Sequence, residues 1–190
     1  MEKKALVVLT DGFEDVEAIA PIDVLTRSGV KVIVAGLKPG PVKAAYGTTI
    51  MPDTHLGAIS EHDFDAIIFP GGRVNAQGLA GDSRVVELIH KHVQSGKLVA
   101  AICAAPSHVL AEAAGILKGR RATGDPSFND RLAAGGAIAT GEQVTVDGAI
   151  ITGMGPGAAM LFALALTEYM AGKETADTYA MKWRIDRRAI

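Results

Sequence analysis

Cysteine is nearly absent from this sequence, which has a single one, Cys103, among its 190 residues. An internal disulfide is therefore excluded, and one reduced thiol is what we expect of a cytoplasmic protein. An excess of charge of one sign is lacking as well, because 19 basic and 21 acidic side chains leave a formal net charge of −2. Nucleic-acid-binding domains carry a basic patch or stripe, so we expect no nucleic acid as a partner.

Long hydrophobic runs are also missing. The longest, Ala158–Leu166, is shorter than the roughly 18 apolar residues of a membrane-spanning helix. Near the N-terminus, the apolar stretch Ala5–Leu9 is too short for the core of a signal peptide. We therefore expect neither a membrane partner nor a secretory leader. The length suits one complete hydrophobic core, and we predict a single domain over residues 1–190.

Apolar runs typical of buried strands alternate with segments typical of helices. Strands are predicted at Ala5–Leu9, Val30–Gly36, Thr48–Met51, Ala66–Phe69, Lys97–Ile102, Ala137–Thr140, Gln143–Val146 and Ala149–Thr152. Helices are predicted from Asp11 to about Ser28, at Asp82–Gln94 and Ala104–Ala114, from Gly155 to about Met170, and after Lys173. Repeated strand–helix units predict an α/β fold with a mostly parallel sheet and helices on both faces.

Three polar or glycine-rich segments directly follow predicted strands. They are Asp11-Gly12, Gly71-Gly72 and Cys103. In parallel sheets the functional residues lie beyond the carboxyl ends of the strands. The sequence therefore predicts that these segments meet in one site.

The turn around Cys103 has the pattern of a nucleophile elbow, with a strand before it, a helix after it and the small residues Ala101 and Ala105 two positions away on either side. The helix start should lower the pKa of the thiol and favour thiolate. The amide of Ala104 would bind an oxyanion together with that of Gly72, beside Gly71. A purely structural role stays open, since free cysteine is often just a small buried residue.

A histidine partner for the thiol is hard to find among the five histidines. None follows His108, which lies five residues along the helix from Cys103 and should project away from the turn. His90 and His92 diverge on a helix, so we expect no metal site.

A carboxylate is the alternative, and Glu17 is the candidate. Pro21 cannot donate a hydrogen bond to the Glu17 carbonyl, so the first helix should bend there, which suggests a site; a tolerated kink is the structural explanation. If Glu17 is buried beside Cys103, burial raises its pKa until it is protonated. A protonated carboxyl can donate to the sulfur and relay a proton.

These residues resemble the ThiJ/PfpI superfamily, particularly the branch of the parkinsonism-associated deglycase. The matching segments are ALVVLTDGFEDVEAIAPIDVL with Glu17, VKVIVAGL, DAIIFPGG ending at Gly72, LVAAICAAP around Cys103, and GPGAAMLFAL. The resemblance implies a flavodoxin-like three-layer sandwich and a homodimer. It also implies that Cys103 is the nucleophile, that Glu17 is its hydrogen-bond partner, and that the amides of Gly72 and Ala104 surround the thiol.

Two positions depart from the parkinsonism-associated member. Asp125 lies where that branch has a histidine near the cysteine, and Tyr46 lies where it has an arginine. Arg27 does match an arginine of the family. Asp125 is therefore a candidate for a polar role, and Arg27 is a second candidate.

Two functional hypotheses follow, and a third treats the chain as an interaction module with an inert thiol. The first is a cofactor-independent glyoxalase or deglycase-type enzyme, with no metal, acting on small reactive dicarbonyls such as methylglyoxal and glyoxal or on their adducts. The second is a non-catalytic oxidative-stress sensor or chaperone whose Cys103 oxidises to sulfinate. A homodimer is also expected from the first helix, whose apolar residues exceed what one sheet face needs: Val16, Ile19, Ala20 and Val24.

Overall fold

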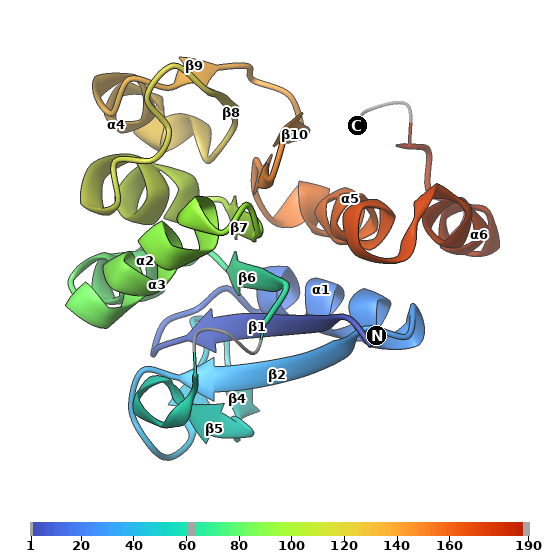
Figure 1. Cartoon of the computed structure of the whole chain (residues 1–190), viewed down its shortest axis with the longest axis horizontal. Coiled ribbons are helices and arrows are strands. Elements are labelled where there is room, and N and C mark those ends of the chain that lie inside the picture. Colours follow the sequence, from blue (N-terminus) through green and yellow to red (C-terminus); the bar gives the residue numbers. More distant parts are fainter. Residues whose placement is uncertain (1, 61–63, 188–190) are drawn as a thin grey trace.

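The computed structural model describes residues 2–60 and 64–187, and its centre is a seven-stranded sheet (Figure 1). The strands lie in the order β10-β11-β7-β6-β1-β2-β5, and every neighbouring pair is parallel except β10 and β11. They are β1 (Lys4–Leu9), β2 (Lys31–Gly36), β5 (Thr54–His55), β6 (Ala66–Phe69), β7 (Leu98–Ile102), β10 (Val144–Asp147) and β11 (Ile150–Gly153). The predicted mostly parallel sheet is confirmed.

Helices cover both faces of this sheet (Figure 1). They are α1 (Asp15–Arg27), α2 (Arg73–Ala80), α3 (Ser83–Gln94), the Pro106–Ala113 helix, α4 (Asn129–Ala134), α5 (Ala159–Ala171) and α6 (Lys173–Trp183). On one face α1 packs against α5, and α6 packs on α5. On the other face lie α3 and α2, and the Pro106–Ala113 helix contacts both α2 and α4. The predicted α/β sandwich of three layers is confirmed.

Short elements connect these layers. They are the antiparallel pair β3 (Val42–Lys43) and β4 (Thr49–Ile50), the parallel pair β8 (Arg121–Ala122) and β9 (Ile138–Ala139), and the 3₁₀ turns Leu56–Ala58, Pro126–Phe128 and Pro156–Ala158. The predicted strands at 48–51 and 137–140 therefore exist, but both lie outside the main sheet.

The central strands are buried on both faces, as their unbroken apolar sequences predicted. Every residue of Ala5–Leu9, Ala66–Phe69 and Leu98–Ile102 is inaccessible to solvent. These residues belong to a hydrophobic core that continues into the helices of both faces. No helix within the described part of the chain is long and apolar enough to cross a membrane.

The first helix begins later than the sequence predicted. Its N-cap is Glu14, whose carboxylate accepts the N–H of Glu17 at 2.8 Å, whereas the carboxylate of Asp11 accepts the N–H of Lys43 in β3. Pro21 lies inside α1 and does not end it. As a result, Glu17 lies in the first turn of α1, at the carboxyl edge of the sheet.

The helix after Cys103 also differs from the expected α-helix over Ala104–Ala114. It is a π-helix at Pro106–Ala113, and beyond its end the N–H of Ala114 donates to the carbonyl of Val109, five residues earlier, at 2.9 Å. Such wide turns are rare and are frequent near functional sites.

Phe162 offers a direct test of the core between α5 and the sheet. Its side chain is fully buried and lies against Gly153 at the end of β11. We expect Phe162→Ala to lower the free energy of unfolding by about 3–5 kcal/mol, because it leaves a cavity. Met181→Ala, at a residue that is 75% exposed on α6, should change it by less than about 0.5 kcal/mol. Similar values in urea titrations of the two variants would contradict this packing.

Candidate active site

Three adjacent strands, β1, β6 and β7, end at one edge of the sheet, and the residues that follow them meet there. A Cβ atom placed on Gly71, after β6, would lie 2.5 Å from the Cβ of Cys103, after β7, and 2.4 Å from Oε2 of Glu17, on α1. The site expected from the sequence is therefore one place. Its centre is the contact among these three residues.

Cys103 adopts a backbone conformation that side chains rarely adopt. Its φ angle is +64°, in the left-handed region. Its N–H donates to the carbonyl of Gly153 at 2.9 Å, and its carbonyl accepts the N–H of Asp125 at 2.8 Å, so the end of β11 and the loop that carries Asp125 hold it in place. This strained turn between β7 and a helix is the geometry of the predicted nucleophile elbow.

Gly71 and Gly72 are glycines because nothing larger fits. A Cβ at Gly72, whose φ is +85°, would lie 2.2 Å from the carbonyl oxygen of Gly12. The Gly72 backbone amide lies close enough to the sulfur to lower the pKa of the Cys103 thiol. Gly72 therefore lies beside the thiol, and its amide favours the thiolate. Ala104 is buried directly after Cys103, and its expected role as an oxyanion donor stays a prediction.

Glu17 is completely buried, and its carboxyl lies beside the Cys103 thiol, which lowers its pKa in part. Oε2 accepts the Gly71 N–H at 2.9 Å, while buried Oε1 has no hydrogen-bond partner of good geometry within the described residues. Burial, with a smaller contribution from the nearby charge of Glu14, raises the pKa of Glu17 to about 7. A proton on Oε1 would remove the unpaired charge and give the sulfur a donor.

The sequence analysis predicted a lowered pKa for the Cys103 thiol, and this prediction is wrong. Burial, followed by the charge of Glu17, raises the pKa of Cys103 to about 12, and the Gly72 amide opposes this only in part. The sequence argument counted the helix start but not the desolvation or the carboxylate. Protonation of Glu17 removes the second of the two causes.

Asp125 reaches the sulfur from the opposite loop. Its Oδ2 lies 3.8 Å from Sγ of Cys103, at the long end for a sulfur donor, and its Oδ1 accepts the N–H of Ser127 at 2.8 Å. The structure therefore brings together Cys103, Glu17 and Asp125, all three of which were candidates from the sequence.

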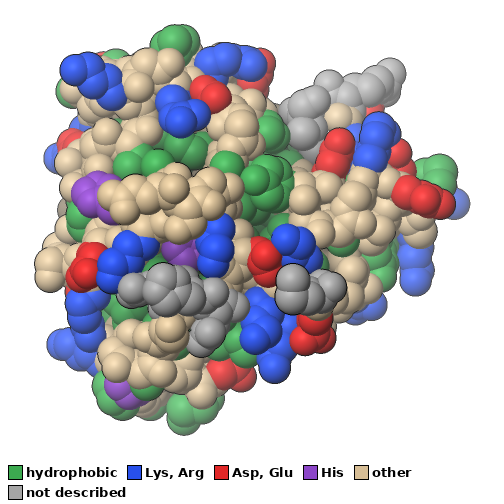
Figure 2. Space-filling model, in the orientation of Figure 1, with side chains coloured by type: hydrophobic (Ala, Val, Ile, Leu, Met, Phe, Trp, Pro, Cys, Tyr) green, Lys and Arg blue, Asp and Glu red, His purple; other side chains and the backbone are tan. Residues whose placement is uncertain are grey.

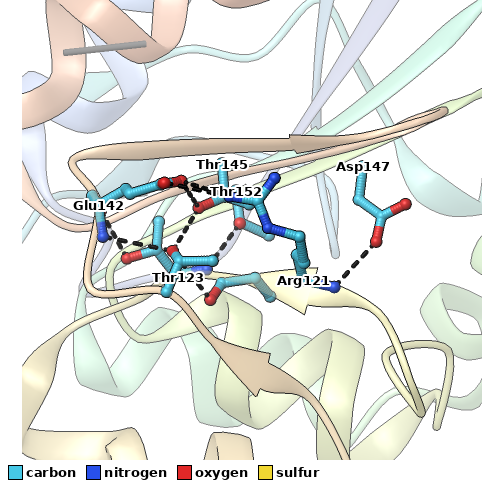
Figure 3. Close-up of polar contacts among 8 residues, drawn as sticks. Arg121, Thr123, Glu142, Thr145, Asp147 and Thr152 are labelled. Carbon is cyan, nitrogen blue, oxygen red and sulfur yellow. Dashed lines mark hydrogen bonds and ion pairs between the residues drawn. The ribbon is translucent and has the colours of Figure 1, made fainter.

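The segment before Asp125 is tied to the sheet by a polar network (Figure 3). The N–H of Thr123 donates to Oγ1 of Thr152 in β11 at 2.9 Å, and its hydroxyl donates to the carbonyl of Glu142 at 2.7 Å. The Glu142 carboxylate in turn accepts from Thr145 and from Arg121, on β10 and β8. Thr123, Thr145 and Thr152 are all buried, so this network fixes where the Asp125 loop starts.

A cavity of about 610 Å³ opens beside Asp125. Its other lining residues come from the loops after β9 and β11: Gln143, Met154, Gly155, Pro156, Gly157 and Ala158, with Pro126 next to Asp125. Asp125 thus faces both the sulfur and a space that suits a small molecule.

Several expected or possible participants lie elsewhere. Arg27 is at the far end of α1, where it pairs with Asp23 at 2.9 Å, so it is not part of the thiol site. The ring of His108 bonds the Ala104 carbonyl at 2.9 Å and packs edge-on against Phe128. Within residues 2–60 and 64–187, no three histidine, cysteine or acidic side chains are grouped to hold a metal ion.

Asn75, on α2, is a site residue that sequence reasoning missed. Its amide group is fully buried, donates to the carbonyls of Pro70 and Gly71 at 2.8 and 3.1 Å, and accepts the N–H of Thr10 at 2.8 Å. It therefore locks the turn that carries the Gly71 and Gly72 amides. An asparagine three residues after a Pro-Gly-Gly turn was the available signal.

Glu17→Gln tests the buried carboxyl. Because its folded pKa is raised from 4.5 to about 7, the folded protein binds the extra proton, and the wild type loses stability as pH rises through that window. The variant lacks this loss. As the pH rises through this window, the free energy of unfolding should therefore fall by about 3 kcal/mol more in the wild type than in Glu17→Gln. Urea titrations from about pH 4 to 8 measure this. Exposed Glu87→Gln is the control, and a pH-independent difference for Glu17→Gln would refute the raised pKa.

Comparisons with known proteins identify the family of this chain. The DJ-1/PfpI family model matches residues 3–169. Protein dj-1beta of Drosophila melanogaster is 40% identical over 181 residues, which is 95% of this chain and 96% of that protein. The Parkinson disease protein 7 homolog of Danio rerio is 38% identical, over 92% and 93% of the two chains.

A third relative and a solved structure extend the comparison. The glutathione-independent glyoxalase DJR-1.2 of Caenorhabditis elegans is 37% identical, over 93% of this chain and 94% of that protein. The crystal structure of Drosophila melanogaster DJ-1beta superposes with a TM-score of 0.91 at 37% identity, over 98% of this chain and 100% of that one. Like these proteins, the chain has the flavodoxin-like sandwich of parallel strands and flanking helices, and it belongs to the DJ-1/PfpI family.

Proposed function

We propose that this protein is a cysteine-dependent glyoxalase or deglycase-type enzyme. Its substrates would be small reactive dicarbonyls, such as methylglyoxal and glyoxal, or their early adducts. The observation that carries the proposal is the buried Glu17 carboxyl in contact with a cysteine held at positive φ. The relative named as a glutathione-independent glyoxalase supports the same reaction class.

The first step is attack of the Cys103 sulfur on the aldehyde carbon. A C–S bond forms, the carbonyl π pair moves to oxygen, and that oxygen takes up a proton to give a hemithioacetal. The Gly72 amide lowers the pKa of the thiol, which favours the thiolate that attacks. The Ala104 amide is the proposed donor to the developing oxyanion.

Glu17 performs the second step. Its carboxylate removes the proton from the former aldehyde carbon, giving an enediolate, and returns it to the neighbouring carbon, while the hydroxyl proton passes from the first oxygen to the second. A thioester of a hydroxy acid results, and water hydrolyses it to the free acid and thiol. A pKa of about 7 suits this exchange, because both protonation states of Glu17 are then populated near neutral pH. The sequence of steps uses no metal or organic cofactor, and a cytoplasmic setting would keep the thiol reduced.

The second candidate function is that of a non-catalytic oxidative-stress sensor or chaperone, and it is favoured by one observation. Cys103 has no second cysteine with which to form an internal disulfide, so oxidation would proceed from sulfenate to sulfinate. A protonated Glu17 would donate a hydrogen bond to either product. Intact mass after mild peroxide, compared between wild type and Glu17→Gln, measures this, and an unmodified wild-type chain would refute it.

Conversion of methylglyoxal to lactate tests the enzyme proposal. We expect Cys103→Ser to abolish turnover, because the nucleophile is lost, and Glu17→Gln to lower it by about 10² or more, because an amide can donate to sulfur but cannot exchange a proton with substrate. Glu87→Gln, an exposed residue on α3, should behave as wild type. Turnover that survives in Cys103→Ser, or is absent from the wild type, would contradict the proposal.

A homodimer through α1 is the second part of the proposal. Val16 and Ile19 are 50% and 43% exposed on this helix, whereas Ala20 and Val24 are buried in the core. A twofold contact would cover the two exposed residues. Sedimentation at micromolar concentration should give twice the chain mass of 19.7 kDa, and Val16→Asp with Ile19→Asp should give the monomer. A wild-type monomer would refute the dimer.

A further inference from the structure

Two peptide groups of the turn after β6 have their N–H ends in the candidate site. The N–H of Gly71 donates to Oε2 of Glu17 at 2.9 Å, and the N–H of Gly72 lies beside the sulfur of Cys103. The carbonyl ends of the same two peptide groups belong to Pro70 and Gly71. Because the C=O and N–H of a trans peptide group point in opposite directions, a contact that holds these carbonyls also sets where the two N–H groups point.

Both carbonyls are held by the side chain of Asn75, on α2. Its Nδ2 donates to the carbonyls of Pro70 and Gly71 at 2.8 and 3.1 Å, and its Oδ1 accepts the N–H of Thr10, directly after β1, at 2.8 Å. The carbonyls need a donor and the Thr10 N–H needs an acceptor, so the three contacts together fix the orientation of the side-chain amide. Asn75 is fully buried, and solvent does not reach these bonds.

We propose that Asn75 is a positioning residue of the thiol site. By holding the two carbonyls on the α2 side of the turn, it directs the two N–H groups to the opposite side, toward the carboxyl of Glu17 and the sulfur of Cys103. A carbonyl that accepts a hydrogen bond also polarises its own peptide group, which strengthens the donor at the other end. This inference rests on the proposed dicarbonyl chemistry and deepens it, because it names the residue that prepares both reacting groups without touching substrate.

The turn needs such a residue because glycine does not restrict its own backbone. Gly72 is also the N-cap of α2, and it makes no side-chain capping hydrogen bond. The Gly71 carbonyl accepts a second hydrogen bond, from the N–H of Glu14 at 3.2 Å, but this contact does not hold the Pro70 carbonyl. Asn75 holds both carbonyls and ties them to the end of β1, the strand that precedes the helix of the catalytic carboxyl.

Loss of the Gly71 N–H changes the pKa of Glu17 in a definite direction. This N–H and the thiol of Cys103 lower the pKa of Glu17, whereas burial and the charges of Glu14 and Asp125 raise it. No excess of one sign competes with these groups on the face shown in Figure 2, where basic and acidic side chains are interspersed. A displaced Gly71 amide therefore raises the pKa of Glu17 further above about 7.

Asn75→Ala is the test variant, with Thr167→Val as its matched control. Thr167 is also fully buried, and its hydroxyl donates to the carbonyl of Ala163 within α5 at 2.9 Å. The control therefore loses a buried hydrogen bond to a carbonyl outside the site. Carbon NMR of labelled glutamate follows the Glu17 carboxyl, and hydrogen exchange follows the Gly71 N–H, which bonds Glu17 and not Asn75.

We expect Asn75→Ala to raise the Glu17 midpoint by about one pH unit, which corresponds to the loss of one hydrogen bond to a charged group. Exchange of the Gly71 N–H should become about tenfold faster or more. The kcat for methylglyoxal should fall about tenfold with little change in KM, because Asn75 does not touch substrate, and the pH profile should move with the Glu17 midpoint. Thr167→Val should change none of these.

An unchanged Glu17 midpoint or unchanged Gly71 exchange in folded Asn75→Ala overturns the proposal, and so does an equal change in Thr167→Val, which indicates general loosening. If Asn75→Ala does not fold, Asn75→Asp replaces it. This variant has the same shape and keeps the acceptor for the Thr10 N–H, but a carboxyl carries at most one proton and cannot donate to both carbonyls. Its Gly71 exchange should be faster, and an unchanged rate overturns the proposal.

The two proposals can fail separately, because the NMR and exchange measurements use no substrate. If both change as expected in Asn75→Ala but the wild type does not turn over methylglyoxal, Asn75 keeps its positioning role and the proposed substrate class fails. If the wild type turns over methylglyoxal but Glu17 and Gly71 are unaffected in the variant, the enzyme proposal stands and the role of Asn75 is refuted.

Discussion

The site depends on one interaction, the burial of the Glu17 carboxyl against the Cys103 thiol. A carboxyl without solvent resists ionisation, and the sulfur beside it resists ionisation for the same reason. The two groups therefore compete for protons, and the surrounding donors decide the outcome. This competition explains why the turn after β6 lies so close to both groups. The Gly71 amide donates a hydrogen bond to the Glu17 carboxyl, and the Gly72 amide lowers the pKa of the thiol.

Much of this arrangement could be predicted from the sequence. The continuous apolar runs at Ala66–Phe69 and Leu98–Ile102 identify strands buried on both faces, and parallel strands bring the segments after them to one edge. The alanines around Cys103 predict its tight turn, which has a φ of +64°. Glu17 was found because Pro21 follows it by four residues, although the helix continues through this proline without ending.

The remaining features depend on contacts between residues far apart in sequence. The pKa of the thiol was predicted in the wrong direction because a helix start can be read locally, whereas desolvation and the position of Glu17 depend on the fold. Asn75 locks the glycine turn through Pro70 and Thr10, and no periodicity reveals that contact. The loop that carries Asp125 is likewise held by Thr152, 29 residues further along the chain than Thr123.

The protonation state of Glu17 is the central claim, and carbon NMR of side-chain-labelled glutamate measures it most directly. The Glu17 carboxyl signal, assigned by its absence from Glu17→Gln, should titrate with a midpoint near 7, well separated from the exposed glutamates. Such a result would show a carboxyl that can both donate to sulfur and exchange a proton with substrate near neutral pH. A midpoint at or below the ordinary value of 4.5 would contradict the account, because Glu17 would then be a permanent anion beside the sulfur.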